Sequence, residues 1–276
     1  MAKIERTQVR RRTGTRDEGP VTPVSVPSIV GEQPGVVKSL KGVLFGPPKT
    51  AKTTLACSGK NVLLINFDPD GELTETLVGR EDITVVKPQT FSEIEGIIKA
   101  LHTVDRGRFD WITVDSITFL FQLLGGKELT EVYIQNKDVR RAYGKAGAMV
   151  SQIIHDLTRL PDTNVIFTAH LQKEDGIEDS VAQEAEMGEH EVRVAVTPMV
   201  WKILGPSVSF IGRTYKEGVW EKVEGSKVRN KRNRYVVSFN DGERSPAGSR
   251  LKMDGEYEIE LDTLAKLHDE LVEGDE

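Results

Sequence analysis

The sequence predicts an α/β fold in which a mostly parallel sheet is flanked by helices, with antiparallel strands near the C-terminus. Two observations carry this prediction. From Val37 onward, short apolar runs typical of buried strands alternate with amphipathic segments typical of helices. Beyond about residue 195, strand-like runs are separated by tight turns, which indicates antiparallel pairing.

Length and composition indicate one full-sized domain with appendages. The chain has 276 residues, 38% of them hydrophobic, which is enough to supply a core. Its 37 Lys and Arg against 43 Asp and Glu give a net charge of -6, so the overall balance does not indicate a polyanion-binding protein. The lone Cys57 excludes an intrachain disulfide and fits a reducing compartment. The chain begins without a signal-peptide pattern and has no membrane-spanning run, so we expect a cytoplasmic protein without membrane contact.

The first 36 residues are predicted to form a flexible basic arm. They are rich in Pro, Gly, Ser, Thr and Arg and lack apolar periodicity, and six of the first nineteen are basic. A solvated tail is the favoured interpretation, and an arm that docks nucleic acid or a partner is the alternative. Residues 37–276 are predicted to be one domain, with a core at 37–170 and a β-rich extension at 195–265.

The expected elements follow in order along the chain. Parallel strands are expected at 42–46, 61–67, 82–86, 110–116 and 164–170, helices from 53, at 91–104, at 146–160 and around 196–204, and antiparallel strands at 210–215, 218–223 and 232–240. Ser92 and Glu95 have the spacing of a capping box at the start of the second helix. Ile94, Ile98 and Leu101 then fall on one apolar helical face with Ile97.

The stretch GPPKTAKTT, between the first strand and the first helix, has the outline of a phosphate-binding loop. Its residues are Gly46, Pro47, Pro48, Lys49, Thr50, Ala51, Lys52, Thr53 and Thr54. In such a loop backbone N–H groups surround a phosphate, the lysine reaches the β- and γ-phosphates, and the hydroxyl binds Mg²⁺. We therefore predict an ATP site, with Lys52 and Thr53 in those two roles.

Ala51 departs from the loop pattern, which has glycine there. A left-handed conformation with a Cβ costs roughly 1–2 kcal/mol. Two alternatives remain open: the strain is present and tolerated, or position 51 is close to helical geometry and carries none.

Three later strands end in polar residues that are candidates for the same site. Asp115 ends the strand at 110–116, as in a Walker B segment whose carboxylate holds Mg²⁺. Asp68 follows the second strand and is a candidate general base, although a turn residue in DPDG is the alternative. His170 ends the strand at 164–170 and is a candidate γ-phosphate sensor, with a structural strand-end histidine as the alternative. Ligands of open α/β sheets bind at this edge.

The order of these motifs is similar to that of a known group. GVLFGPPKTAKTTLA, VLLINFDPDG, FDWITVDSIT, the pair Tyr143-Gly144 before an amphipathic helix, and LPDTNVIFTAH follow one another. The chain resembles the phage-encoded AAA-domain ATPases with a RecA-like core, which include single-strand annealing recombinases. The resemblance covers residues 41–170 and extends more faintly to about 255.

The resemblance implies ATP and Mg²⁺ as cofactors, held by Lys52, Thr53 and Asp115. It places Asp68 where the group has a catalytic glutamate, and His170 where a polar residue links ATP to a DNA-binding loop. Gly248-Ser249-Arg250 keeps only the arginine of a Lys-x-Arg pattern, so we expect Arg250, on a loop beyond the last strand, to complete a neighbouring subunit's site. It further implies assembly into a ring or filament, action on single-stranded DNA, and an annealing or single-strand-binding protein as partner.

Two other functions stay open. The segment VLLINFDPDGELT also resembles ParA-type partition ATPases, but these carry a lysine five residues before the loop lysine, where this chain has Pro47. A nucleotide-binding module without hydrolysis is the second alternative, because of Ala51 and because position 68 is aspartate instead of glutamate.

Charge is divided unevenly around the expected DNA surface. Residues 171–194, where RecA-type proteins place a DNA-contacting loop, hold eight acids and two bases and should repel DNA. Basic clusters occur instead at 137–145 and at 213–234, and the second has eight Lys or Arg against three Glu. Tyr215, Trp220 and Tyr235 are interleaved there, as a stacking platform for single strands requires, and a solvated hairpin face is the alternative.

Overall fold

The computed structural model describes residues 37–69, 74, 76–134, 139–173, 192–222, 229–240, 242 and 245–273. The predicted basic arm at 1–36 and most of the acidic segment, residues 174–191, lie outside these ranges. For residues 127–139 and 221–231, only those within helices or strands are described, and by their backbone alone.

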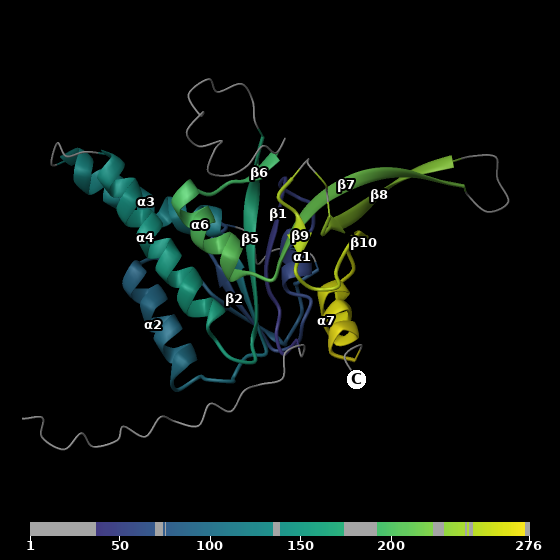
Figure 1. Ribbon diagram of the computed structural model, residues 1–276, viewed down its shortest axis with the longest axis horizontal. Helices are drawn as coiled ribbons and strands as arrows, with labels where there is room; N and C mark the ends of the chain where they lie inside the picture. The colour runs from purple at the N-terminus through teal and green to yellow at the C-terminus, as the bar shows by residue number, and fades with distance from the viewer. Residues whose placement is uncertain are drawn as a thin grey trace, which may run out of the picture. The chain divides into compact units, whose positions relative to one another are not determined.

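A mixed sheet forms the centre of the domain (Figure 1). Its strands lie in the order β10-β8-β7-β1-β5-β4-β2-β3, and β6 and β9 pair with β5 and β7 respectively. Their bounds are β1 Lys41–Gly46, β2 Val62–Asn66, β3 Ile83–Val86, β4 Trp111–Asp115, β5 Asn164–Lys173, β6 Val192–Val194, β7 Phe210–Lys222, β8 Arg229–Ser238, β9 Gly248–Ser249 and β10 Glu256–Glu258.

Strands β3, β2, β4, β5, β1 and β7 run parallel, and β8 and β10 are antiparallel additions beyond β7. The predicted fold class, a mostly parallel sheet flanked by helices with antiparallel C-terminal strands, is confirmed. Strands β1, β2 and β4 are buried along nearly their whole length, because helices cover both faces of the sheet.

Helices divide between the two faces of the sheet (Figure 1). Their bounds are α1 Lys52–Ala56, α2 Phe91–His102, α3 Ile117–Ile134, α4 Val139–Thr158, α6 Pro198–Ser207 and α7 Thr263–Glu273. Helices α2, α3, α4 and α6 bury their apolar residues on one face, and α1 and α7 bury theirs on the other.

Helix α2 begins one residue earlier than its expected cap. Its N-cap is Thr90, whose hydroxyl accepts a hydrogen bond from the Glu93 N–H at 3.2 Å, while the Glu93 carboxylate accepts from the Gln89 N–H at 2.7 Å. The capping box predicted at Ser92 and Glu95 is therefore wrong, because the same threonine-to-glutamate spacing occurs two residues upstream.

The C-terminal strands also differ from the prediction. The two strands expected at 210–215 and 218–223 are one continuous strand, β7. Its first residues, Phe210–Arg213, pair parallel with β1, and only β8 on its other side is antiparallel over a long stretch. Gly218 lies within this strand without turning it, opposite Asn233.

Candidate functional site

The loop after β1 turns through two residues with left-handed backbone conformations. Lys49 has φ 61°, and Ala51, the N-cap of α1, has φ 61° and ψ 25°. An alanine with this conformation carries strain of about 1–2 kcal/mol. The alternative that position 51 is close to right-handed helical geometry is therefore wrong, and the loop tolerates the strain.

Thr50, between these two residues, ties the loop to β7. Its hydroxyl donates to the Pro47 carbonyl at 2.8 Å and lies 2.7 Å from the Thr214 hydroxyl. Both threonines are buried. Gly46 allows this close approach, because a Cβ built there would lie 2.3 Å from the Thr214 carbonyl oxygen. The loop and the strand that leads into the β7–β8 hairpin are thus packed directly together.

Lys52 is the buried cation of the loop. Its Nζ donates to the carbonyls of Gly46 at 3.1 Å and Pro47 at 2.7 Å. Burial lowers the pKa of Lys52, although the charges of Asp115 and Asp68 act in the opposite direction. A lysine held by carbonyls of its own loop, close to two carboxylates, is well placed to move onto a phosphate.

Asp115 lies at the end of β4 between two hydroxyl donors. Thr53 donates to Asp115 Oδ2 at 2.7 Å, and Thr168, on the neighbouring strand β5, donates to Oδ1. Burial raises the pKa of Asp115, while the two hydroxyls lower it. The Thr53 and Asp115 oxygens are ligands of the kind that Mg²⁺ takes.

Asp68 follows β2, the strand beside β4. Its backbone N–H donates to the Asn66 side chain at 2.9 Å and to the Asp115 carbonyl at 3.1 Å, which fixes the turn after the strand. The Asp68 side chain is partly exposed, and its charge acts on Lys52, Asp115 and His170. Both of its predicted roles, general base and turn residue, fit this position.

His170 lies opposite Gly46 in the register of β1 and β5. Its ring is half-buried and makes an edge-to-face contact with Phe119 at a centroid distance of 5.2 Å. Burial lowers the pKa of His170, and the charge of Lys52 lowers it further. The strand was expected to end at His170. It continues to Lys173 instead, because β6 pairs with this extension.

Arg250 does not join this group of residues within one chain. It follows β9, which pairs with the start of β7, and its N–H donates to the Ser209 carbonyl at 2.8 Å. This position is at the amino edge of the parallel strands, opposite the loop. The expectation that Arg250 lies beyond the last strand is wrong, since β10 follows it. Its exposed side chain donates to the Pro206 carbonyl at 3.3 Å.

The structure adds side chains that sequence reasoning missed. Thr168 and Thr214 contact Asp115 and Thr50 from neighbouring strands, and Phe119 reaches His170 from α3. Thr168 precedes His170 by two residues, so the alternation of side chains along a strand places both on one face. This spacing could have identified Thr168 from the sequence.

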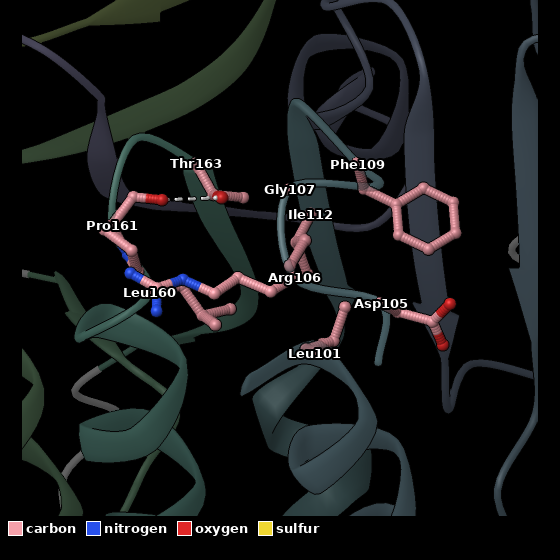
Figure 2. Close-up of a pocket in the computed structure, with 9 residues that line it drawn as sticks. All are labelled: Leu101, Asp105, Arg106, Gly107, Phe109, Ile112, Leu160, Pro161 and Thr163. Carbon is pink, nitrogen blue, oxygen red and sulfur yellow. Dashed lines mark hydrogen bonds between the residues drawn. The ribbon is translucent and has the colours of Figure 1, made fainter. Parts of the chain in front are cut away.

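A small cavity lies at the opposite edge of the sheet (Figure 2). It has a volume of about 10 Å³ and is bordered by Leu101, Phe109 and Leu160, among others. A space of this size holds about one water molecule. This cavity is too small to hold a nucleotide.

A family model described as AAA domain matches residues 38–251. No curated protein matches the chain. Among solved structures, the crystal structure of the RadB recombinase is similar, with 15% identity and a TM-score of 0.41 over 80% of this chain and 91% of that one. That likeness is too low to carry an argument.

Proposed function

Because the chain belongs to the AAA-domain family of P-loop ATPases, we propose that it binds ATP with Mg²⁺ and hydrolyses it at the carboxyl edge of β1, β5 and β4. The observation that carries the proposal is the 2.7 Å hydrogen bond between Thr53 and Asp115, beside the buried Lys52. This pair brings a loop hydroxyl and a strand-end carboxylate together as a magnesium site requires.

The proposal assigns the metal ion, the phosphates and the attacking water to different residues of the site. Thr53 and Asp115 would hold Mg²⁺, which neutralises charge on the phosphates. Backbone groups of residues 46–54 would surround the phosphates, with Lys52 on the β- and γ-phosphates. Asp68 would accept a proton from the attacking water, and its partly exposed position at the strand end leaves it open to water.

His170 would respond to the γ-phosphate, because its half-buried ring lies opposite Gly46 at the start of the loop. Its lowered pKa keeps the imidazole neutral at pH 7, so that one ring nitrogen donates and the other accepts. The edge-to-face contact with Phe119 supports the ring orientation that such a role needs.

The proposal includes assembly of several subunits into a ring or filament. Arg250 is exposed at the edge opposite the loop, so it reaches an ATP site only when a second subunit stacks against that edge. An arginine supplied in this way neutralises charge that develops on the γ-phosphate.

The finer part of the proposal is action on single-stranded DNA in recombination, repair or replication, by a phage-encoded protein in the host cytoplasm. The order of motifs over residues 41–170 supports it, together with the basic cluster at 213–234. An annealing or single-strand-binding protein would be the partner. No helix in the described part of the chain is long and apolar enough to span a membrane.

Steady-state ATP turnover, measured with and without Mg²⁺ and with and without single-stranded DNA, tests this function. We expect Mg²⁺-dependent turnover that single-stranded DNA increases. Tight ATP binding without turnover would instead support the non-hydrolysing module. Turnover stimulated by duplex DNA alone would support the partition-type alternative.

A further inference from the structure

The β7–β8 hairpin extends beyond the parallel sheet as a two-stranded ribbon (Figure 1). Strand β7 pairs with β1 only as far as Arg213, whereas its pairing with β8 continues to Lys222. Within the described residues, β8 pairs with β10 only at Val236–Ser238. Beyond the Lys216–Tyr235 pair, neither strand of the ribbon pairs with a third strand among the described residues.

The two faces of the ribbon differ in charge. Directly paired residues of antiparallel strands share a face, and successive pairs alternate between faces. The first face, here called the basic face, contains the register pairs Lys216–Tyr235, Gly218–Asn233, Trp220–Lys231 and Lys222–Arg229. The second face contains Glu217–Arg234, Val219–Arg232 and Glu221–Asn230. None of the eight residues that the register assigns to the basic face is acidic.

The arginines of the second face are neutralised by carboxylates. Arg234 lies 2.9 Å from the Glu217 carboxylate, and Arg232 lies 3.6 Å from that of Glu258 on β10. These contacts satisfy the charge locally. The second face thus has the composition of a solvated hairpin face, which was the alternative interpretation of the whole cluster.

The basic face carries two aromatic residues, Trp220 and Tyr235, near the cation of Lys216. Trp220 is 61% exposed, the exposed side chain of Lys216 lies 5.8 Å from the centre of the Tyr235 ring, and Gly218 between them adds no side chain. A large exposed indole has no role in the core. Cations beside exposed rings are the combination that binds a single strand, since the cations contact phosphates and unpaired bases stack on the rings.

We propose that the basic face of the β7–β8 ribbon binds single-stranded nucleic acid, with Lys216 on the phosphate backbone and Trp220 as the stacking platform. This inference rests on the proposed function, because it names the surface that would bind the single-stranded DNA. Duplex DNA fits less well, because its bases are already stacked on one another and leave no free ring face for Trp220. An acidic protein partner would use the charge but not the exposed indole.

The ribbon is also joined to the ATP loop. Strand β7 enters it directly after Thr214, whose hydroxyl lies 2.7 Å from that of Thr50 in the loop. A strand bound on the basic face would therefore lie close to the nucleotide edge of the same subunit. The other basic cluster, at 137–145, includes Arg141, which is exposed on α4 and serves as the competing site in the test.

The test measures affinity for an oligo-dT strand by fluorescence anisotropy in full-length variants. Trp220→Leu keeps apolar bulk but removes the ring, so affinity should fall about five- to 100-fold, whereas Trp220→Tyr should stay within about threefold of wild type. Lys216→Gln should reduce the slope of log affinity against log salt by about 0.7, and the matched variant Arg232→Gln should leave it unchanged. Melting temperatures from circular dichroism check that each variant is folded.

Other outcomes would overturn the inference. Unchanged affinity in Trp220→Leu and Lys216→Gln, or loss in Arg141→Ala instead, would place the strand elsewhere. Equal losses for duplex DNA or for poly-L-glutamate would identify a general anion surface. ATP affinity of the wild-type protein, measured on the same preparation, separates the two proposals: if ATP binds and the ribbon variants change nothing, the inference alone has failed. If ATP does not bind but the variants lose the strand, the ATPase proposal alone has failed.

Discussion

A lysine lies at each edge of the parallel sheet, half-buried at Lys41 and buried at Lys52, but the chemistry around these two lysines differs. Lys41 begins β1, and its Nζ donates to the carbonyl of Leu160 at 2.9 Å and to that of Thr163. Lys52 follows the other end of the same strand and donates to the carbonyls of Gly46 and Pro47. By hydrogen bonding alone the two sites are nearly equivalent.

The neighbours of the two lysines separate their roles. Lys41 donates to Leu160 and Thr163, in the connection from α4 to β5, and these two residues border the cavity of about 10 Å³ (Figure 2). One carboxylate, that of Asp162, acts on its charge. Lys52 lies within the influence of Asp68 and Asp115, and its charge acts on His170. A buried lysine therefore does not mark a site by itself. At the carboxyl edge, the Asp115 carboxylate accepts hydrogen bonds from Thr168 on the adjacent strand and from Thr53 in the loop, at the edge where ligands of open α/β sheets bind.

Among substitutions that compare the two edges, the largest expected effect is on the rate of ATP hydrolysis when Asp68 is replaced. Asp68→Asn should lower ATP hydrolysis by ~10²-fold or more while leaving ATP affinity nearly unchanged, because the amide cannot accept the proton of the attacking water. Asp68→Glu should retain turnover. Asp105→Asn, at the amino edge beside the small cavity, is the control and should hydrolyse ATP at the wild-type rate. Full turnover in Asp68→Asn would assign the residue to the turn only.

Asp115, the last residue of β4, and Asp110, directly before its first residue, allow the same comparison across one strand. Asp115→Asn should reduce the affinity for ATP in Mg²⁺ by about 10- to 100-fold and change it little in EDTA, because the carboxylate acts on the metal ion. Asp110→Asn, at the exposed start of the strand, should keep the full Mg²⁺ effect. Isothermal titration calorimetry under both conditions gives the four affinities. A loss at Asp115 that is the same in EDTA would make it a structural residue.

A smaller effect is expected from the strained loop residue at the carboxyl edge. Ala51→Gly removes a Cβ from a residue with φ 61° and should raise the free energy of unfolding by about 0.5–1 kcal/mol. Ala148→Gly, exposed in the right-handed helix α4, should instead lower it by about 1 kcal/mol. Urea unfolding of the two variants measures both changes. A decrease in both would show that the loop does not hold residue 51 in a left-handed conformation.

At the amino edge, a pH dependence of stability is expected from Lys41. Burial lowers its pKa to about 8 from an ordinary value of 10.5. Between these values the unfolded chain binds more protons than the folded one, so folding stability at this site increases as pH rises. The difference in free energy of unfolding between wild type and Lys41→Met should therefore shift in favour of wild type from pH 8 to pH 10. A constant difference would mean that the ammonium is as well solvated folded as unfolded.

Much of the sheet could be predicted because buried parallel strands leave a local mark. The apolar runs at 42–46, 61–67 and 110–116 match β1, β2 and β4 to within one residue at each end, since turns bound them on both sides. Helix α3 was missed because it begins two residues after β4 with the nearly continuous apolar run ITFLF, which shows no helical periodicity. Phe119, its contact to His170, was missed with it.

The candidate site divides in the same way. Lys52, Thr53 and Asp115 follow from motifs in which each role is tied to a local spacing. Thr168 and Thr214 act through the register of β5 and β7 against their neighbours, and no local pattern fixes a register between strands distant in sequence. The faces of the ribbon likewise depend on the pairing of β7 with β8. The sequence therefore shows how many basic residues lie at 213–234, but not which of them share a face.

The most direct test of the central claim, that the carboxyl edge binds ATP, is to compare ATP affinity in Lys52→Met and Lys41→Met by isothermal titration calorimetry below both melting temperatures. Each variant removes one ammonium that donates to backbone carbonyls and leaves a side chain of similar length. We expect Lys52→Met to lose about 10- to 100-fold in affinity, because a hydrogen-bonded charge partner of the phosphates is gone. Lys41→Met should bind ATP as wild type does. Equal affinities in the two variants would contradict the claim.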